Sequence, residues 1–516
     1  MRLIFAALLV LIGVGLAVDA YLVIKPALHV VLVSTAALLL FRFCLKPEYR
    51  PALVWRTLVI AAGMPILAWS MSNIWLLFLA LGIGVPLVAR RFSMIVPVYL
   101  FALLLLPGLD TEVMIGSLKL FDCGVFDALA IGAAGAIALN KAKGRAPVAH
   151  DAAACAVILL IGFGLAREAS FPHLLRSLVN VALDLGLPYY IVTRGVRSLD
   201  EIRTAMLWIG CGAVTLGTLL AYELTKSWPI YNILYANYDL PTLLIVKERA
   251  GYLRTGGPFT EPTSVAMVLA ICILCLWLGR VFARSSWHHH LLLAVAMAGL
   301  FAPQSRGAWI GLIIGMIVSE LFRRRYFSIL RKGFAVTAAL SVLLLAATIS
   351  PDVSESIGLS GDSSESSDYR RRLLDRGVEV IMARPITGYS TTELQVTLND
   401  MRQGEGIIDY VNAYIWIALI TGIGGLLLFV APFLYYLKEI WRLRWRARKS
   451  YPLREAATFL FAALIMMMEM LFFNSFGTRP AVFVFILFGL STTFLRSVRR
   501  EGRATMPQGA LVTATA

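Results

Sequence analysis

Blocks of apolar residues follow one another along the chain from its start to about residue 495. Most of them have the length of about 16 to 25 residues that spans a hydrocarbon core of roughly 30 Å as a helix. Backbone polar groups inside lipid need internal partners, so these blocks must be helical. The pattern predicts an all-α polytopic integral membrane protein with about 14 to 16 transmembrane helices. The expected spans lie near 3–23, 27–44, 53–70, 73–89, 92–107, 123–140, 152–166, 174–194, 205–223, 262–280, 290–304, 307–322, 334–349, 412–436, 456–474 and 479–495.

The composition agrees with this pattern and removes several function classes. The chain is 59% hydrophobic and 15% charged, with a mean hydropathy of +0.77, whereas a soluble domain is nearer one quarter charged. Its net charge of +16 comes from short loops between apolar blocks rather than from a basic patch on a soluble domain, so nucleic-acid binding is not expected. No metal or cofactor is expected either. The pair Cys272 and Cys275 has no second ligand pair, and the adjacent His288, His289 and His290 cannot easily converge on one ion.

The basic loops set the expected orientation. Under this count of spans they share one side of the membrane, which the positive-inside rule identifies as the cytoplasm. Both termini are then cytoplasmic, with the start of the chain forming a first membrane helix rather than a cleaved signal. These loops are centred on Arg90 and Arg91, Lys141 to Arg145, Arg194 to Arg203, Arg280 to Arg284, Arg323 to Lys332, Arg442 to Lys449, and Arg496 to Arg503.

Two long connections fall on the opposite, periplasmic side. The second contains a helix-like apolar pattern over 369–383, which predicts a helix on the membrane surface or over a cavity mouth. The expected divisions are an N-terminal bundle (1–222), a first periplasmic loop (223–261), transmembrane helices with two arginine motifs (262–349), a large periplasmic loop with the amphipathic helix (350–411), C-terminal transmembrane helices (412–495) and a cytoplasmic tail (496–516).

Two arginines stand at expected helix starts on the periplasmic side. Arg254 precedes Gly256 and Gly257, which permit a tight turn or close backbone approach to a ligand, and the free amides of the next helix would favour an anion. The alternative is that Arg254 reaches lipid phosphate from an ordinary loop. Arg306 lies between two apolar runs that leave little room for a loop, where a cation is costly unless it faces a cavity or partner.

A third group of arginines lies in the amphipathic pattern of the large loop. Arg370, Arg371, Arg372 and Arg376 could clamp a diphosphate through bidentate hydrogen bonds. The alternative is that they pair with neighbouring acids, which are Asp368, Asp375 and Glu379.

The order of these motifs resembles the O-antigen ligase and polymerase superfamily of bacterial membrane glycosyltransferases. The segments are R-x-x-G-x-F-x-E-P-x-x-x-A from Arg254, S-R-G-A around Arg306, A-R-P-I-T-G-Y ending at Tyr389, and Y-V-N-A-Y from Tyr410 entering a helix. The resemblance covers about 205–495. It implies transfer of glycans carried on undecaprenyl diphosphate, at the periplasmic face of the inner membrane and without a metal.

The resemblance also implies site residues. Arg254 and Arg306 match the arginines of the first two motifs. The family commonly has His-Asn where this chain has Val411-Asn412, and its Glu-Gly is Thr421-Gly422 here, so another base is required. Asp409, Glu405 and Glu261 are candidates, of which Asp409 is favoured because it lies three residues before Asn412. The catalytic set is therefore Arg254, Arg306, Asp409 and Asn412, and the substrate-binding set is Gly256, Gly257, Glu261, Arg370, Arg371, Arg372, Arg376 and Tyr389.

Other functions stay open at this stage. A polymerase of exopolysaccharide or O-antigen repeats is favoured over a ligase with a lipid A-core acceptor, because the F-T-E-P form of the first motif is closer to exopolysaccharide polymerases. Other polysaccharide assembly proteins are candidate partners besides the bilayer. A flippase would use intramembrane acids such as Asp19, Asp184 and Glu320, but its polar residues should gather at the midplane rather than at one face. An inactive scaffold is a third alternative.

Overall fold

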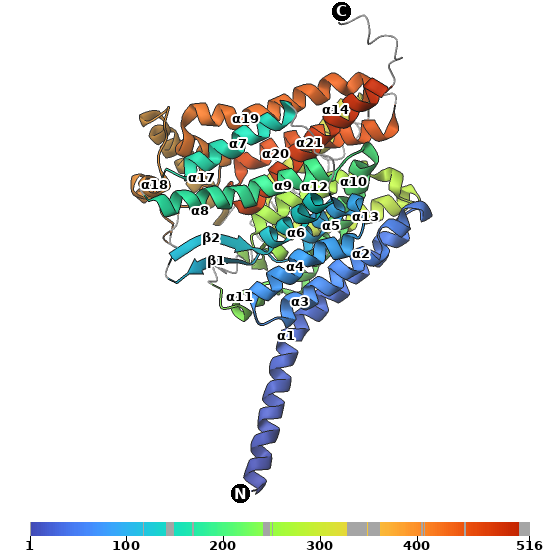
Figure 1. Cartoon of the computed structure of the whole chain (residues 1–516), viewed down its shortest axis with the longest axis vertical. Coiled ribbons are helices and arrows are strands. Elements are labelled where there is room, and N and C mark those ends of the chain that lie inside the picture. The colour runs from blue at the N-terminus through green and yellow to red at the C-terminus, as the bar shows by residue number, and fades with distance from the viewer. Residues whose placement is uncertain are drawn as a thin grey trace, which may run out of the picture.

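The protein is described by a computed structural model that covers residues 2–116, 118–140, 149–167, 170–240, 248–249, 251–327, 348, 362–403, 406, 408–447 and 450–504. This part of the chain is a bundle of helices with two short β-hairpins (Figure 1). Within it, five helices are long and apolar enough to cross a membrane, and shorter apolar helices accompany them. The expected fold class, an all-α polytopic membrane protein, is confirmed.

The first helix differs from the expectation. The sequence predicts separate spans at 3–23 and 27–44, but α1 (Arg2–Cys44) is one continuous helix with Pro26 inside it. Its N-terminal part extends beyond the rest of the bundle in Figure 1. Lys25 at the expected break lies over the ring of Trp228, 5.6 Å from the centroid. The break that the sequence predicts between residues 23 and 27 is therefore wrong, since the helix continues through Lys25 and Pro26.

The later helices of the N-terminal half follow the expected spans. They begin after the 3₁₀ turn η1 (Pro47–Ala52) and include two π-helical turns, η2 and η4. The elements are α2 (Val54–Leu58), η2 (Val59–Gly63), α3 (Met64–Ser70), α4 (Ile74–Ala89), η3 (Phe92–Met94), α5 (Ile95–Leu105), β1 (Asp110–Ile115), β2 (Leu118–Gly124), α6 (Val125–Leu139), α7 (Ala149–Leu165), α8 (Phe171–Val181), η4 (Ala182–Gly186), α9 (Leu187–Gly195) and α10 (Leu199–Lys226).

The second half carries the motifs at its helix ends. The expected span at 334–349 falls outside the described residues apart from residue 348. The elements are α11 (Asn232–Asn237), β3 (Glu248–Arg249), β4 (Tyr252–Leu253), η5 (Gly257–Phe259), α12 (Pro262–Leu278), η6 (Arg280–Phe282), α13 (Ser286–Phe301), α14 (Arg306–Phe322), α17 (Asp362–Ala383), α18 (Thr391–Thr397), η7 (Asn399–Met401), α19 (Ala413–Ala447), α20 (Tyr451–Phe473) and α21 (Thr478–Ala504).

The helix at the centre of the bundle, α12, is apolar around its whole circumference. Almost every residue of α12 is buried, as expected for a helix that is hydrophobic all round. Helix α10 packs against α5, α12 and α13 around it. Small residues allow the closest approach: a Cβ at Gly299 of α13 would lie 2.2 Å from Gly217 Cα of α10. These contacts place the helix ends, and with them the motifs, at fixed positions.

The expected amphipathic helix forms, but it packs on protein. In α17 the side chains of Leu373, Val380 and Ile381 are buried together with Ile415 and Leu419 of α19. The apolar stripe that suggested a membrane surface thus covers the first turns of α19. This contact fixes which arginines of α17 can face the rest of the bundle.

The loops gather at two opposite ends of the bundle. At one end, which we call the basic end, the Lys46 amide donates to Phe282 O (2.9 Å) and the Arg284 amide donates to Cys44 O (2.9 Å). The other end, which we call the loop end, holds the β1–β2 hairpin and the described residues of the segments 228–261, 302–306 and 384–412, and lies toward the left of Figure 1. There the Gly108 amide donates to Pro258 O (3.0 Å). The basic loop at Arg280 to Arg284 thus lies away from the motif-bearing loops, and the expected basic loop at Lys141 to Arg145 falls outside the described residues.

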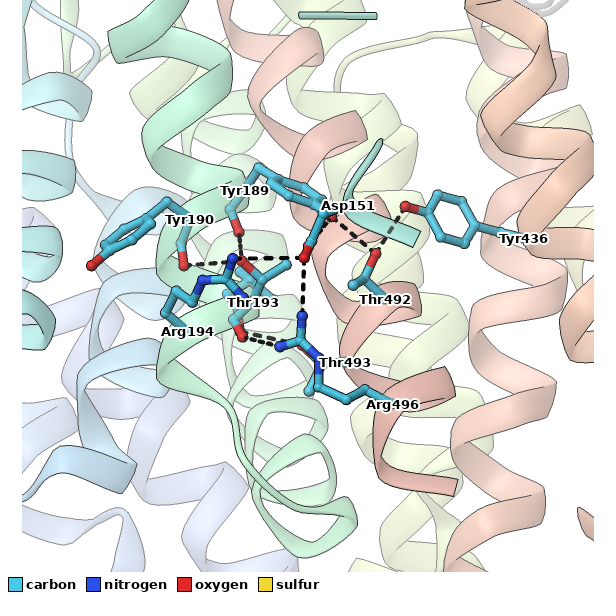
Figure 2. A network of polar contacts seen from close by, with 10 residues as sticks. Asp151, Tyr189, Tyr190, Thr193, Arg194, Tyr436, Thr492, Thr493 and Arg496 are labelled. Carbon is cyan, nitrogen blue, oxygen red and sulfur yellow. Dashed lines mark hydrogen bonds and ion pairs between the residues drawn. The ribbon is translucent and has the colours of Figure 1, made fainter. Parts of the chain in front are cut away.

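A buried polar network joins α7, α9, α19 and α21 near the basic end (Figure 2). Asp151 accepts from Arg496 (3.2 Å) and from the hydroxyl of Tyr189 (2.8 Å). Thr492 connects Tyr189 to Tyr436, at 3.1 and 2.8 Å. Buried polar groups are costly unless they are paired, so this network specifies how the last helix docks.

Candidate functional site

The β3–β4 hairpin brings two arginines to the turn between α13 and α14. Gly251, with a φ of +72°, closes the hairpin. The Arg249 guanidinium donates to Gln304 O (3.1 Å), and Arg254 Nε donates to Pro303 O (3.3 Å). Both side chains therefore lie beside the residues that immediately precede α14.

Arg306 is the first residue of α14 and projects from the same turn. The turn is tight, since Gln304 has a φ of +51°. Among the described residues, Arg306 has no hydrogen-bond or ion-pair partner. Arg370 of α17 likewise has none in the described part of the chain, although Asp409 interacts with it electrostatically.

The pKa values show that these four arginines influence one another. Burial and, after it, the positive charges of Arg249, Arg370 and Arg306 lower the pKa of Arg254 to about 10. The carboxylate of Glu261 opposes the shift. We call Arg249, Arg254, Arg306 and Arg370 the arginine cluster.

Two other members of the cluster show the same perturbation. Burial lowers the pKa of Arg306. Partial removal from water lowers the pKa of Arg370, the carboxylate of Asp409 raises it, and the charge of Arg306 lowers it. Like charges held together with little compensation favour a bound anion. The cluster can therefore bind a phosphate or diphosphate group through several guanidinium hydrogen bonds.

The expected binding glycines lie beneath the cluster and support the loop. The Gly257 amide donates to the buried carboxylate of Glu223 (3.0 Å), and its φ of +51° suits glycine. A Cβ at Gly256 would lie 2.4 Å from the carbonyl carbon of Thr260. Both glycines are buried, so the structure explains them by the close packing of this turn.

Glu261 lies at the start of α12, near Arg254. Its carboxylate accepts from the hydroxyl of Thr263 (2.8 Å) and from that of Ser264. These two bonds orient Glu261 at the helix start, and its negative charge reaches Arg254. The position agrees with the expected neighbourhood of the first motif.

Asp409 and Asn412 lie at the entry to α19, on the other side of the cluster. The Tyr369 hydroxyl, next to Arg370 in α17, donates to Asp409 O (3.1 Å). Asn412 Oδ1 accepts from the amides of Tyr414 (3.0 Å) and Ile415 (3.2 Å), so Asn412 caps the helix. The alternative base Glu405 lies outside the described residues.

Only one of the four arginines predicted in α17 joins the cluster. Arg371 and Arg372 are exposed, as is Arg370, but only Arg370 is among the charges that lower the pKa of Arg254. Arg376 pairs with Glu379 (2.7 Å) and with Asp400 (3.3 Å), which follows the alternative of acidic pairing. A helix turns by about 100° per residue, so these arginines point in different directions around α17, and the charge of Arg370 reaches Arg306.

Tyr389, which the resemblance places in the substrate-binding set, is buried. Its amide donates to Leu419 O (2.7 Å), and its carbonyl accepts from Arg167 (2.8 Å). Arg167 also donates to Ile420 O (2.6 Å). The A-R-P-I-T-G-Y segment is thus fastened to the kink in α19 at Gly422, where φ is +74°.

Sequence reasoning missed three residues around the site. Arg249 lies outside the sequence motifs, and its strand β3 has only two residues, too few to be recognised from the sequence. Arg479 donates to the hydroxyls of Thr260 (3.0 Å) and Tyr235 (3.1 Å) and so holds the first motif in place. Glu469 of α20 has both carboxylate oxygens buried without a hydrogen-bond partner among the described residues, and an intramembrane acid is a signal that could have found it.

The comparison with known families agrees with the motifs. Residues 290–430 match the family model described as O-antigen ligase. The matched segment contains Arg306, Arg370, Asp409 and Asn412, and it excludes Arg249 and Arg254. None of the curated proteins compared with the chain matches it. The match supports a function of the O-antigen ligase or polymerase type, and it confirms that the chain carries a domain of the O-antigen ligase and polymerase superfamily.

Proposed function

We propose that the chain is a glycosyltransferase that takes glycan repeat units from undecaprenyl diphosphate and joins them to a growing glycan. The observation that carries the proposal is the arginine cluster at the loop end. Four guanidinium groups from β3, the loop after β4, α14 and α17 meet there, and burial together with the charges of the other three lowers the pKa of Arg254 to about 10. Such a site suits a substrate that brings two phosphates.

The proposed chemistry follows from this charge. An acceptor hydroxyl attacks the anomeric carbon, the new glycosidic bond forms, and the bond from that carbon to the diphosphate oxygen breaks. Negative charge develops on the leaving undecaprenyl diphosphate, where fixed guanidinium groups stabilise it. In this scheme Arg254 and Arg306 take the role that a metal ion has in other phosphate sites.

Asp409 is the proposed base for the acceptor hydroxyl. Its backbone is fastened to Tyr369, and its charge interacts with the neighbouring Arg370. A carboxylate next to the cluster would face a hydroxyl that approaches the bound diphosphate donor. The proton lost by the hydroxyl passes to this carboxylate. The variant Asp409→Asn should therefore lose activity while keeping diphosphate binding, and an Asp409→Asn protein with full activity would remove this role.

The proposed orientation places the loop end in the periplasm. Lysine and arginine gather in the loops of the basic end, which the positive-inside rule assigns to the cytoplasm of the inner membrane. Lipid-linked repeat units exposed at the outer leaflet could then reach the cluster directly. A reporter of membrane side, such as cysteine labelling at exposed Arg372→Cys, tests this assignment.

The first experiment replaces Arg254 and Arg306 singly by alanine in the native host and separates the surface polysaccharide on a gel. The matched control is Arg372→Ala, because Arg372 is exposed on the same helix as Arg370. Loss of an anion-holding donor costs about 2.7–4 kcal/mol in the transition state. Long glycan chains should therefore disappear from both variants and persist in the control, at equal membrane levels.

The remaining products separate the functions. A polymerase, which we favour from the F-T-E-P form of the first motif, leaves single repeats on the acceptor. A ligase leaves lipid-linked polymer but no glycan on lipid A-core. An unchanged ladder in both alanine variants rejects the catalytic reading and leaves a flippase or a scaffold of the assembly complex.

A further inference from the structure

A cavity of about 590 Å³ lies at the basic end, far from the arginine cluster. It is formed where the end of α12 and the loop after it meet the start of α13, the end of α14 and the start of α20. Helix α14 connects the two places: Arg306 begins it, and Arg323 follows its last residue. The 17 residues of this helix correspond to about 25 Å at roughly 1.5 Å per residue. The cavity is therefore a separate place from the proposed active site.

The walls of the cavity carry a strong excess of positive charge. Two glutamates also line it, Glu320 and Glu455, and both are almost fully buried, with 3% and 4% of their surfaces exposed. Among the lining residues the basic side chains outnumber these acids by six to two. The six are Lys46, Arg280, Arg284, Arg323, Arg325 and Arg454.

The guanidinium of Arg323 lacks one hydrogen-bond acceptor in the described part of the chain. It interacts electrostatically with Glu455 and Glu320. Its Nε atom is nevertheless buried without a hydrogen-bond acceptor among the described residues. A buried N–H group without an acceptor is costly. An anion in the cavity could supply the acceptor that the protein does not.

The positive-inside rule accounts for basic residues in these loops but not for their arrangement. Topology requires arginines near the headgroups, and exposed side chains on convex loops would satisfy it. Here arginines from the loop after α12, from the loop after α14 and from α20 converge on one concave space. Hydroxyl groups of Ser285 and Ser286 line the same space, and the Ser286 hydroxyl accepts from Arg280.

We propose that this cavity binds a phosphate-bearing anion at the basic end of the bundle. Several guanidinium groups around one cavity suit phosphoryl oxygens, which accept paired hydrogen bonds from arginine. The phosphate group can belong to an anionic phospholipid of the adjoining leaflet or to a soluble diphosphate. Because the cavity shares no residue with the arginine cluster, this proposal does not depend on the proposed function.

The test uses the full chain with the loop-end site removed by Arg254→Ala and Arg306→Ala, so that diphosphate binding there does not interfere. In this background, Arg280→Gln with Arg284→Gln removes two charges from the cavity. The matched control is Arg442→Gln with Arg499→Gln, which removes two charges at exposed positions where both arginines pair with Glu439. If the cavity variant fails to fold, Arg325→Gln with Arg454→Gln takes its place.

Two measurements distinguish the sources of the phosphate. Calorimetric titration of inorganic diphosphate into phosphatidylcholine nanodiscs reports a soluble ligand. Native mass spectrometry of protein released from discs containing phosphatidylglycerol reports a retained lipid. The cavity variant should weaken binding by roughly tenfold or more, and the control should leave it unchanged. Absence of both kinds of binding, or equal loss in the cavity and control variants, would overturn the proposal.

Discussion

Replacing Arg306 by glutamine should change activity and stability in opposite directions. In the substrate-free protein the arginines of the cluster repel one another. A pKa of about 10 for Arg254 means that the protein disfavours the charged form of this side chain by about 3 kcal/mol relative to water. Burial is the largest cause, so each neighbouring arginine accounts for less than about 1 kcal/mol of this. Arg306→Gln should therefore stabilise the substrate-free protein by up to about 1 kcal/mol.

The same change should greatly slow the reaction. An anion-holding donor lost from the site costs about 2.7–4 kcal/mol in the transition state, or roughly a hundredfold to a thousandfold in rate. The assay compares thermal unfolding by tryptophan fluorescence, without substrate, with product formation in the same nanodiscs. Added inorganic diphosphate should raise the unfolding temperature of the wild type more than that of the variant.

Arg372→Gln is the control, since this residue is exposed on α17 and is not among the charges that lower the pKa of Arg254. It should leave both stability and activity close to the wild type. Replacing an arginine with a purely structural role would lower the stability and the activity of the protein together. If Arg306→Gln shows that joint loss, the reasoning from charge repulsion fails and Arg306 belongs to the framework.

Three further predictions concern the framework. Arg496→Ala removes one of two arginines that pair with the buried carboxylate of Asp151, the other being Arg194. It should cost about 1.5–3 kcal/mol in a denaturant titration, whereas exposed Arg499→Ala should cost less than about 1 kcal/mol; equal costs would contradict this. Gly422→Ala should lower the thermal unfolding midpoint, because φ is +74° and the new Cβ would lie 2.4 Å from Ile386 O; an unchanged midpoint would count against the kink. Glu469→Met should stabilise the protein by about 1–3 kcal/mol, since neither carboxylate oxygen has a hydrogen-bond partner in the part of the chain that the structure describes. A loss of stability would show that the carboxylate is satisfied.

The helices were predictable because lipid leaves few alternatives. Apolar blocks of spanning length must form helices, and the described helices from Val54 onward fall on the expected spans except α11, α17 and α18, which lie in the two long connections. The break at Lys25 and Pro26 was wrong for a local reason. The ring of Trp228, far along the chain, lies near the lysine ammonium, and apolar periodicity carries no information about such a contact.

The site was predictable where a residue stands at a helix start. Arg254 and Arg306 could be selected because glycine, proline and short turns place them at the ends of apolar spans. Arg249 could not, because it reaches the cluster through a hairpin whose strands have two residues each. Arg370 could not be separated from Arg371, since only the packing of α17 on α19 decides which arginine faces the bundle.

The partners of each arginine explain why the cluster can bind an anion and why other arginines of the loop end cannot do so as well. Arg376 and Arg384 donate to the carboxylates of Glu379 and Glu393, which orient these arginines and also neutralise them. Arg254 instead donates to a backbone carbonyl, that of Pro303. A carbonyl orients a guanidinium without cancelling its charge, so the positive potential remains for a ligand. If an engineered carboxylate replaced the carbonyl as the acceptor, the arginine would be held equally well. Its charge would then be neutralised, so diphosphate binding would weaken.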